Sequence, residues 1–412
     1  MLKNYFKIAI AVLKRRKFFT FISLFGISFT LTILLVLTAF IDKVVGDSYP
    51  DKKRDRSLYI SRISQVGKNA TQSGPVSYYF LDHYVRTLKT PVKIAISSGF
   101  NGTNTYVNNK KIAVNYKYTN ADFWDVLEYN FIEGKPFNKQ QIDNEDKVAV
   151  ISEDMKKEYF GEDVGSVVGK YIEADNVKYR VTGVIKSVPV TSYMLYSDIY
   201  LPYTVAKDKG YKTNKNYGGY YYGILLAKSK SDVQKMHEEY EQMVSRLPVE
   251  DKKNFTNVYS HANSYIKAYV DTGDEKRSGT FIVITAISIF ALILMILPTL
   301  NLVNINITRI MERSSEIGVR KAFGASSRTL VYQFIVENII LTLLGGILGV
   351  VLSFIALQIL NNAHLIANLE LTINFTVLFI GLLVCLFFGL LSGVYPAWRM
   401  SKLNVVTALK AQ

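Results

Sequence analysis

The sequence has 412 residues, of which 49% are hydrophobic, and its formal net charge is +15 at pH 7. A chain of this length can hold two or three domains; it is too apolar for an ordinary soluble protein and too polar for one that lies wholly within a membrane. Its single cysteine, Cys385, excludes a disulfide within the chain.

The N-terminal region combines a basic segment with a long apolar segment. Residues 1–17 carry six Lys/Arg and no acid, and residues 18–41 are 24 residues without a charge. About 20 apolar residues suffice to cross a bilayer as a helix. A signal peptide is the alternative, but its apolar core is only roughly 7–15 residues long. We therefore expect a cytoplasmic amphipathic helix over 1–17 and an uncleaved first transmembrane helix over 18–41.

Residues 42–278 are long enough to fold around a core of their own, and their 35 bases and 30 acids nearly balance. The stretch KVAVISEDMKKEYFG predicts a strand followed by a helix over 152–160 that Gly161 ends. Two hairpins are predicted, with turns at Asp175-Asn176 and Asn108-Asn109. We expect an α/β domain with two lobes, outside the cytoplasm.

Two further segments of this domain attract attention. Residues 231–247 place apolar side chains at helical spacing, at Val233, Met236, Tyr240, Met243 and Val244. Residues 193–222 are rich in tyrosine, which fits either a binding surface or edge strands and loops, and the second interpretation is favoured.

No catalytic or metal-binding pattern stands out. The four histidines are not paired at metal-ligand spacing, and neither HExxH nor GxSxG occurs. We therefore expect no enzyme activity, no metal and no bound cofactor in this chain. Any ATP and Mg²⁺ would be bound by a partner.

Three more apolar segments follow the large domain, at residues 279–308, 331–360 and 371–398. The loop 309–330 carries five Lys/Arg and the tail 399–412 carries three, whereas the loop 361–370 carries none. Because basic residues favour the cytoplasmic side of a membrane, both termini and 309–330 are predicted to be cytoplasmic and 361–370 external. The predicted fold is an α-helical integral membrane protein with four transmembrane helices and a large α/β extracytoplasmic domain between helices 1 and 2.

The loop 309–330 is dense in charge and predicts a short amphipathic helix. Glu316 and Arg320 lie four residues apart, a favourable helical pair, and Gly324 is a typical C-terminal stop. From this pattern alone, docking to a cytoplasmic protein and contact with lipid head groups are equally good interpretations.

The same loop resembles the signature of the MacB/FtsX-type permeases of ABC systems. The resemblance lies in ERSSEIGVRKAFGASSRTLVYQFIVENIILTLLGGILG, in the ending YPAWRMSKLNVVTALK and, more loosely, in YFGEDVGSVVGKYIEADNVKYRVTGVIKSVP. It extends over nearly the whole chain. It implies a MacB-like periplasmic core domain, an FtsX-like permease domain and an ATPase that is a separate subunit.

The resemblance also implies a role for the loop as a coupling helix that docks on a cytoplasmic ABC ATPase. The residues implied in ATPase coupling are Arg313, Glu316, Ile317, Gly318, Arg320, Lys321, Phe323 and Gly324. A second permease chain is implied as partner, in a homodimer or heterodimer, besides membrane lipids. A periplasmic adaptor and an outer-membrane channel are further candidates, and no nucleic acid is expected. The implied location is the bacterial inner membrane.

Two functions are compatible with this family. The first is export of a peptide, drug or lipoprotein-type substrate by mechanotransmission, in which ATPase motion reaches the external domain. The second is regulation of a periplasmic partner, such as a cell-wall hydrolase, without transport.

Small and polar residues mark the later spans. Gly345 and Gly349 form one GxxxG pair, and Gly389 and Gly393 form another; such glycines allow close helix packing. Glu337 lies near the cytoplasmic end of the third span. An acid there is either functional or paired with Arg309 or Arg313, and pairing is favoured.

Overall fold

A computed structural model gives the fold. It describes residues 10–11, 13–15, 17–45, 49–107, 109–273, 279–290, 292–293, 296, 327–363, 370–373, 375–376, 378–380, 383 and 386–387. The chain divides into two compact units. We call residues 1–42, 285–365 and 370–412 the helical unit, and residues 43–284 and 366–369 the sheet unit.

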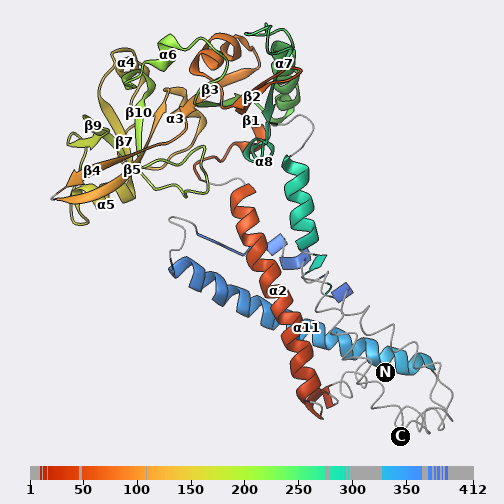
Figure 1. Cartoon of the computed structure of the whole chain (residues 1–412). Helices are drawn as coiled ribbons and strands as arrows, with labels where there is room; N and C mark the ends of the chain where they lie inside the picture. The colour runs from red at the N-terminus through yellow and green to blue at the C-terminus, as the bar shows by residue number, and fades with distance from the viewer. Residues whose placement is uncertain are drawn as a thin grey trace. The chain divides into compact units, whose positions relative to one another are not determined.

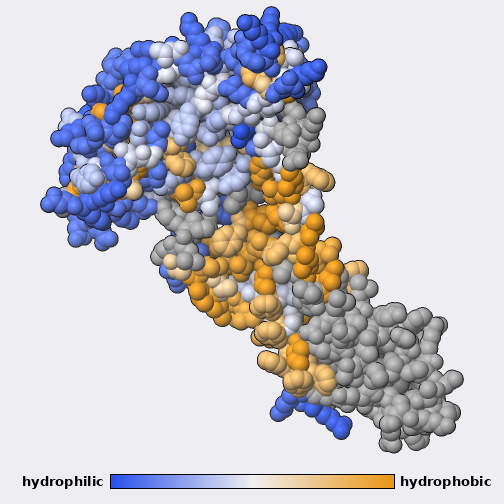
Figure 2. Space-filling view, in the orientation of Figure 1, coloured by the Kyte–Doolittle hydropathy of each residue, from blue (hydrophilic) through white to orange (hydrophobic). Residues whose placement is uncertain are grey.

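The helical unit contains two long apolar helices, α2 (Lys17–Val45) and α11 (Ser327–Asn362). Their segments Lys17–Lys43 and Ile335–Asn362 are long and apolar enough to cross a membrane. Hydrophobic side chains cover the exposed sides of both helices (Figure 2). The shorter apolar helix Gly279–Phe290 begins the predicted second span. Half of the second predicted span and most of the fourth lie outside the described residues, so the count of four stays a prediction.

The sheet unit is built on one mixed sheet of twelve strands (Figure 1). The strands are β1 (Ser57–Val66), β2 (Thr71–Gly74), β3 (Pro91–Ser98), β4 (Asn101–Val107), β5 (Lys110–Thr119), β6 (Phe131–Gly134), β7 (Val148–Ser152), β8 (Tyr171–Ala174), β9 (Val177–Ile185), β10 (Ile199–Pro202), β11 (Tyr221–Ala227) and β12 (Asn257–Asn263).

Short helices connect and cover these strands. They are η1 (Arg54–Arg56), η2 (Phe80–Tyr84), η3 (Val85–Thr87), α3 (Asp122–Val126), α4 (Lys139–Asp143), α5 (Glu153–Phe160), η4 (Tyr203–Val205), α6 (Gly210–Thr213), η5 (Lys230–Asp232), α7 (Val233–Ser245) and α8 (Tyr265–Tyr269).

The strand order is β12-β1-β11-β3-β5-β10-β7-β9-β6, with β2, β4 and β8 attached at β1, β5 and β9. The pairs β5–β10 and β7–β9 are parallel and the others antiparallel. The ladder is narrowest between β3 and β5, where one residue pair, Ser97 with Thr119, is in register. We call β12-β1-β11-β3 with β2 the first half-sheet, and β5-β10-β7-β9-β6 with β4 and β8 the second. The two expected lobes are thus two halves of one sheet.

The predicted hairpins and the strand–helix unit are confirmed. Strands β8 and β9 pair around Asp175 and Asn176, whose φ angles are 51° and 59°, as a type I′ turn requires. Strands β4 and β5 pair with Val107 opposite Lys110. Helix α5 ends at Gly161, where φ is 99°. These elements depend on nearby residues alone, which is why the sequence predicts them.

Helix α7 confirms the predicted apolar stripe. Met236, Tyr240 and Val244 are buried, and Val233 and Met243 pack at the edge of the same cluster. The Oη of Tyr240 lies 2.6 Å from the Oγ of Ser260 in β12. The helix therefore covers the β12 side of the sheet.

One core cluster is shared by the two half-sheets. It joins Tyr59 and Ile224 of the first half-sheet to Val150 and Tyr200 of the second, around Trp124 of α3. Because the same side chains pack against both halves, the halves share apolar burial as well as a ladder.

Lys117 of β5 is completely buried. Its Nζ donates to the carbonyl oxygens of Tyr193, at 3.2 Å, and Met194, at 2.5 Å. It forms no ion pair with any described carboxylate. Burial lowers the pKa of the Lys117 amine to about 7, because removing a charge from water disfavours the ammonium form.

This burial predicts a pH-dependent stability. Between pH 7 and 9 the unfolded chain keeps Lys117 protonated while the folded chain loses the proton, so stability should rise with pH by about 2 kcal/mol. The window stops at pH 9 because burial also raises the pKa of core tyrosines such as Tyr129, and their effect at higher pH has the opposite sign. Chemical denaturation in detergent, followed by the fluorescence of Trp124 in a Trp398→Phe background, measures the slope.

Lys117→Met should abolish most of this slope. Lys110→Met is the matched control, because Lys110 lies on the same strand with its side chain 71% exposed. An equal loss of slope in both variants would contradict the assignment to Lys117.

Candidate functional site

The sheet unit is entered from α2 and left toward the helix Gly279–Phe290, so both of its ends connect to apolar helices in the sequence. The entry segment is residues 49–59 and the exit segment is residues 264–273. We call these two segments together the stem. Helix α8 of the exit segment packs on β1 and β12, which brings the two chain ends together.

A buried ion pair holds the stem. The Nε of Arg54 lies 2.9 Å from an Oδ of Asp51, and the hydroxyl of Tyr59 donates to the same oxygen at 2.6 Å. Asp51 is 1% exposed and Arg54 is 8% exposed. Burial raises the pKa of Tyr59 well above its usual value, and the Asp51 carboxylate raises it further. Tyr59 therefore stays protonated and serves as a donor.

The exit helix α8 completes this cluster. The guanidinium carbon of Arg54 lies 3.6 Å from the ring centroid of Tyr265, a cation–π contact. The rings of Tyr59 and Tyr265 meet edge to face at 5.2 Å. One arginine thus contacts the entry segment through a carboxylate and the exit segment through an aromatic ring.

The end of the exit segment is fixed against β1 and β2. Ser64 donates to the carbonyl oxygen of Gly273 at 3.1 Å and lies 2.8 Å from Ser73. Gly273 has φ +71°, and a Cβ there would lie 2.2 Å from the Oγ of Ser73. A side chain at position 273 would therefore clash with β2, so glycine is required for this close approach.

The arrangement suits mechanical connection. Among the described residues, no group of three or more His, Cys, Asp or Glu could hold a metal. A single carboxylate already engaged by Arg54 and Tyr59 is poorly placed for acid–base work. Packed rings and a buried ion pair instead hold the two chain ends against each other.

In the helical unit, one side of each of the long helices α2 and α11 is buried. Each helix buries every fourth side chain: Ser23, Ile27, Leu31, Leu35 and Ala39 of α2, and Glu337, Leu341, Ser353 and Leu357 of α11.

The predicted glycine pair of the third span lies in this contact. A Cβ on Gly345 would be 2.8 Å from the Cβ of Ile27, and one on Gly349 would be 3.0 Å from the Cβ of Leu31. The Oγ1 of Thr32 also donates to the carbonyl oxygen of Gly349 at 3.2 Å. The partner of this GxxxG pair is therefore α2.

Several predicted site residues are not placed by the structure. The coupling residues Arg313, Glu316, Ile317, Gly318, Arg320, Lys321, Phe323 and Gly324, and the second glycine pair Gly389 and Gly393, lie outside the described residues. Glu337 is buried in α11 at 1% exposure. Arg309 and Arg313 also lie outside the described residues, so its pairing with either of them stays a prediction.

The tyrosine-rich segment 193–222 mostly packs inward. Tyr200 and Tyr217 are buried, and the ring of Tyr203 stacks on that of Tyr78 at 4.3 Å. Tyr220 is the exception, at 48% exposure. These contacts support the interpretation as strands and loops.

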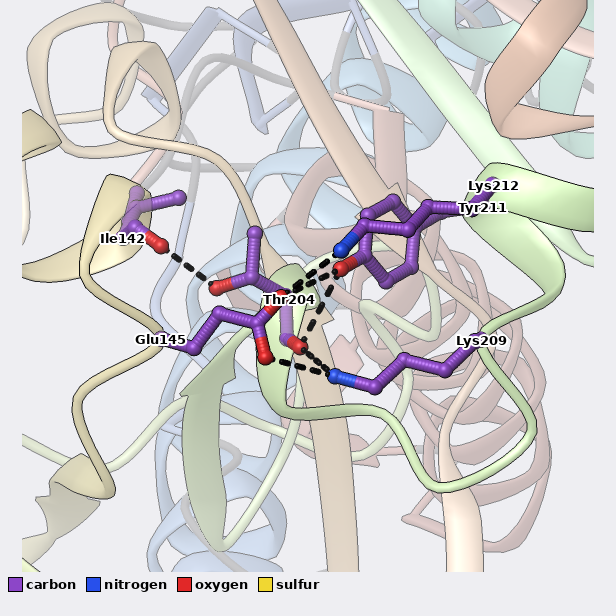
Figure 3. Close-up of polar contacts among 6 residues, drawn as sticks. All are labelled: Ile142, Glu145, Thr204, Lys209, Tyr211 and Lys212. Atoms are coloured by element: carbon purple, nitrogen blue, oxygen red, sulfur yellow. Dashed lines mark hydrogen bonds and ion pairs between the residues drawn. The ribbon is translucent and has the colours of Figure 1, made fainter.

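Part of the segment is held by Glu145 (Figure 3). Its carboxylate lies 2.8 Å from the Nζ of both Lys209 and Lys212 and accepts a 3.2 Å hydrogen bond from Tyr211. The contact with Lys209 and then that with Lys212 lower the pKa of Glu145 to about 2. Thr204 donates to the carbonyl oxygen of Ile142 at 2.7 Å. The cluster therefore ties the segment to the turn after α4.

Sequence reasoning missed the stem cluster. Asp51 and Arg54 are three residues apart and look like an ordinary surface pair. Their aromatic partner Tyr265 is more than 200 positions away in the sequence. Only the pairing of β1 with β12 brings α8 to them.

The structure thus defines a protein with helices long enough to span a membrane and a large mixed α/β domain inserted after the first of them. The family model of the MacB-like periplasmic core domain matches residues 20–243, and that of the FtsX-like permease C-terminal domain matches residues 288–405. The chain belongs to the MacB/FtsX family of ABC transporter permeases.

Two curated relatives illustrate the relationship. The chain is 24% identical over 346 residues to the macrolide export ATP-binding/permease protein MacB of Campylobacter jejuni, covering 83% of this chain and 51% of that protein. It is 26% identical over 293 residues to the uncharacterized ABC transporter permease YknZ of Bacillus subtilis, covering 71% of this chain and 68% of YknZ. The chain spans about half the length of the MacB relatives it matches.

Solved structures of similar domains also match. They include the extracellular domain of YknZ from Gram-positive bacteria, at 13% identity and TM-score 0.36, covering 50% of this chain and 98% of that one. The periplasmic region of MacB from Actinobacillus actinomycetemcomitans matches at 14% identity and TM-score 0.36, covering 53% and 94%.

The stem cluster predicts a large effect of one substitution. Arg54→Met leaves the Asp51 carboxylate buried without its cation, which should lower the free energy of unfolding by about 3–5 kcal/mol. Adding Asp51→Asn should recover much of that loss, because the buried charge is removed. Denaturation followed by Trp124 fluorescence measures both variants.

The control is Arg86→Met, which breaks the half-exposed ion pair with Asp82 and should cost less than about 1 kcal/mol. A similar cost for Arg54→Met and Arg86→Met would show that the stem pair does not stabilise the fold.

The helix contact predicts a second effect. Gly345→Leu should push α2 and α11 apart and destabilise the helical unit by about 1–3 kcal/mol. Gly26→Leu is the matched control, because nothing lies within 4 Å of a Cβ on that glycine of α2. Thermal denaturation in nanodiscs tests the pair of variants; equal melting temperatures would contradict the close contact.

Proposed function

We propose that this chain is the permease subunit of an ABC transporter and couples ATP hydrolysis in a separate ATPase subunit to movement of the sheet unit outside the cytoplasm. The stem cluster is the observation that carries this proposal. Arg54 joins the segment that follows α2 to the segment that precedes the helix Gly279–Phe290. A displacement of either apolar helix would reach the sheet unit through one rigid contact.

The input to this motion is the cytoplasmic loop 309–330. The proposal assigns ATPase docking to the residues around Glu316 and Arg320, which the family signature marks. A short, stiff helix between two spans transmits a rigid-body shift with little slack. Two permease chains, in a homodimer or heterodimer, would face two ATPase copies in the bacterial inner membrane, with ATP and Mg²⁺ bound by the ATPase.

Export of a peptide, drug or lipoprotein-type substrate is the favoured output. The relatives named for macrolide export support this class, and a periplasmic adaptor and an outer-membrane channel would complete the route. The match to the FtsX-like permease domain supports the second candidate, control of a periplasmic partner such as a cell-wall hydrolase. Deletion should change susceptibility to a drug or peptide in the first case and cell shape or division in the second.

Charge reversal in the loop tests the coupling. Glu316→Lys or Arg320→Glu should abolish stimulation of the cognate ATPase, because a docking contact between opposite charges becomes repulsive. The ATPase rate of the reconstituted complex is the measurement, and equal membrane insertion of each variant is the control.

The double variant Glu316→Lys/Arg320→Glu restores an i, i+4 pair of opposite charges with the two signs exchanged. It therefore keeps the helix while reversing both docking charges, which separates loss of docking from loss of the helix. Unchanged stimulation in both single variants, or labelling that places the loop on the same side of the membrane as the sheet unit, would refute the coupling role.

A further inference from the structure

The connection between β9 and β10 is an irregular segment that lies in the core. Residues 186–198 contain no helix or strand, yet Val188, Met194 and Leu195 are buried in the cluster shared by both half-sheets. Buried backbone without regular structure needs other partners for its carbonyl groups. We call residues 189–196 the strap.

Side chains supply those partners. The carbonyl oxygen of Thr191 accepts a hydrogen bond from the hydroxyl of Tyr269 at 3.1 Å. The next acceptors are the carbonyl oxygens of Tyr193 and Met194, both bound by the Nζ of Lys117. Three carbonyl groups of the strap, those of Thr191, Tyr193 and Met194, are thus held from two elements that are distant in sequence.

A third set of donors holds the following residue. The carbonyl oxygen of Leu195 accepts from the hydroxyl of Tyr129 at 2.9 Å and from that of Tyr200 at 2.8 Å. Both tyrosines are buried. The strap is therefore fixed by four side-chain donors, of which Lys117, Tyr129 and Tyr200 are buried and Tyr269 is partly buried.

These donors belong to different halves of the sheet. Tyr269 is on α8, which packs on β1 in the first half-sheet, whereas Lys117 is on β5 and Tyr200 on β10 in the second. The ring of Tyr193 also contacts Tyr269 at 5.1 Å and Tyr222 of β11 at 6.1 Å. The strap therefore bridges the halves beside the place where a single register pair joins β3 to β5.

A buried lysine is an energetically unfavourable way to hold the strap. Burying the amine group of Lys117 without a described carboxylate costs free energy, and a methionine would fill similar space at no such cost. A lysine amine, however, can donate to two successive carbonyl groups at once. This chemistry explains why a lysine is kept in an otherwise apolar core.

We propose that Lys117 is a positioning residue that keeps the strap engaged with both half-sheets, so that a displacement of α8 at the stem reaches the second half-sheet as well as the first. This inference rests on the proposed coupling function, but the contact that it assigns can be tested without any ATPase.

Amide hydrogen exchange of the full-length chain in nanodiscs tests the assignment. Lys117→Met removes both donors at nearly constant volume. Exchange should become about tenfold faster at the strap amides of Ser192, Leu195 and Tyr196, the effect of losing roughly one net hydrogen bond. Exchange at Ala268 of α8 and at Val270, the residue after this helix, should also accelerate, whereas β7 and β9 should keep their protection.

A double-mutant comparison isolates the bridge. Tyr269→Phe alone should also accelerate exchange at α8, and adding it to Lys117→Met should give less than the sum of the two effects, because the strap is already released. Lys110→Met, on the exposed part of β5, should leave all of these amides unchanged.

Two results would overturn the inference. Acceleration confined to the strap, with α8 unchanged in Lys117→Met, would show that the strap does not link the stem to the second half-sheet. Uniform acceleration across β7, β9 and the strap would show that Lys117 only stabilises the domain as a whole. Failure of the loop charge reversal would refute the coupling function while leaving the exchange result intact, so the two failures are distinguishable.

Discussion

The ion pair between Arg54 and Asp51, with Tyr265 over the guanidinium, lies where the two ends of the sheet unit meet. A charge pair removed from water is stable only when both members are fully engaged. Here Tyr59 donates to the carboxylate and the ring of Tyr265 covers the cation. Separating the entry segment from the exit segment would expose the Arg54 guanidinium or the aromatic ring of Tyr265 to water. The entry and exit segments are therefore held in one geometry.

In the helical unit, the two long helices are held together by close backbone packing, which is a different interaction from the ion pair of the stem. Between α2 and α11 there is little charge, and close approach comes from Gly345 and Gly349 against Ile27 and Leu31. In lipid, where apolar side chains gain nothing by leaving the solvent, such contact and hydrogen bonds like that of Thr32 are what favours association. In the sequence, α2 is followed after three residues by the entry segment of the stem, so under the proposed coupling function a shift of this helix pair would be the input to the stem cluster.

The sequence predicts the features that depend on neighbouring residues. Local features include the turn at Asp175-Asn176, the end of helix α5 at Gly161 and the apolar side of α7. The family signature in the loop 309–330 is also local. The stem could not be predicted, because no local pattern relates Arg54 to Tyr265. The burial of Lys117 could not be predicted either. Polar and apolar residues alternate in its strand, and its partners Tyr193 and Met194 are 76 and 77 residues away in the sequence. Burial of a lysine side chain is a property of the assembled sheet and cannot be recognised from the sequence of the strand that carries it.

The number of paired residues between neighbouring strands determines where the sheet unit resists bending and where it can bend. A sheet resists bending where its ladder is continuous, as between β3 and β11, and resists least where one pair, Ser97 with Thr119, joins two strands. If the halves met only there, movement at the stem would be absorbed at this joint. The strap crosses beside the joint and is held by side-chain donors, which can reorient by small amounts without breaking a ladder. Under the proposed coupling, a connection of this kind would allow a small bend and limit a larger one, and part of the stem's displacement would reach the second half-sheet.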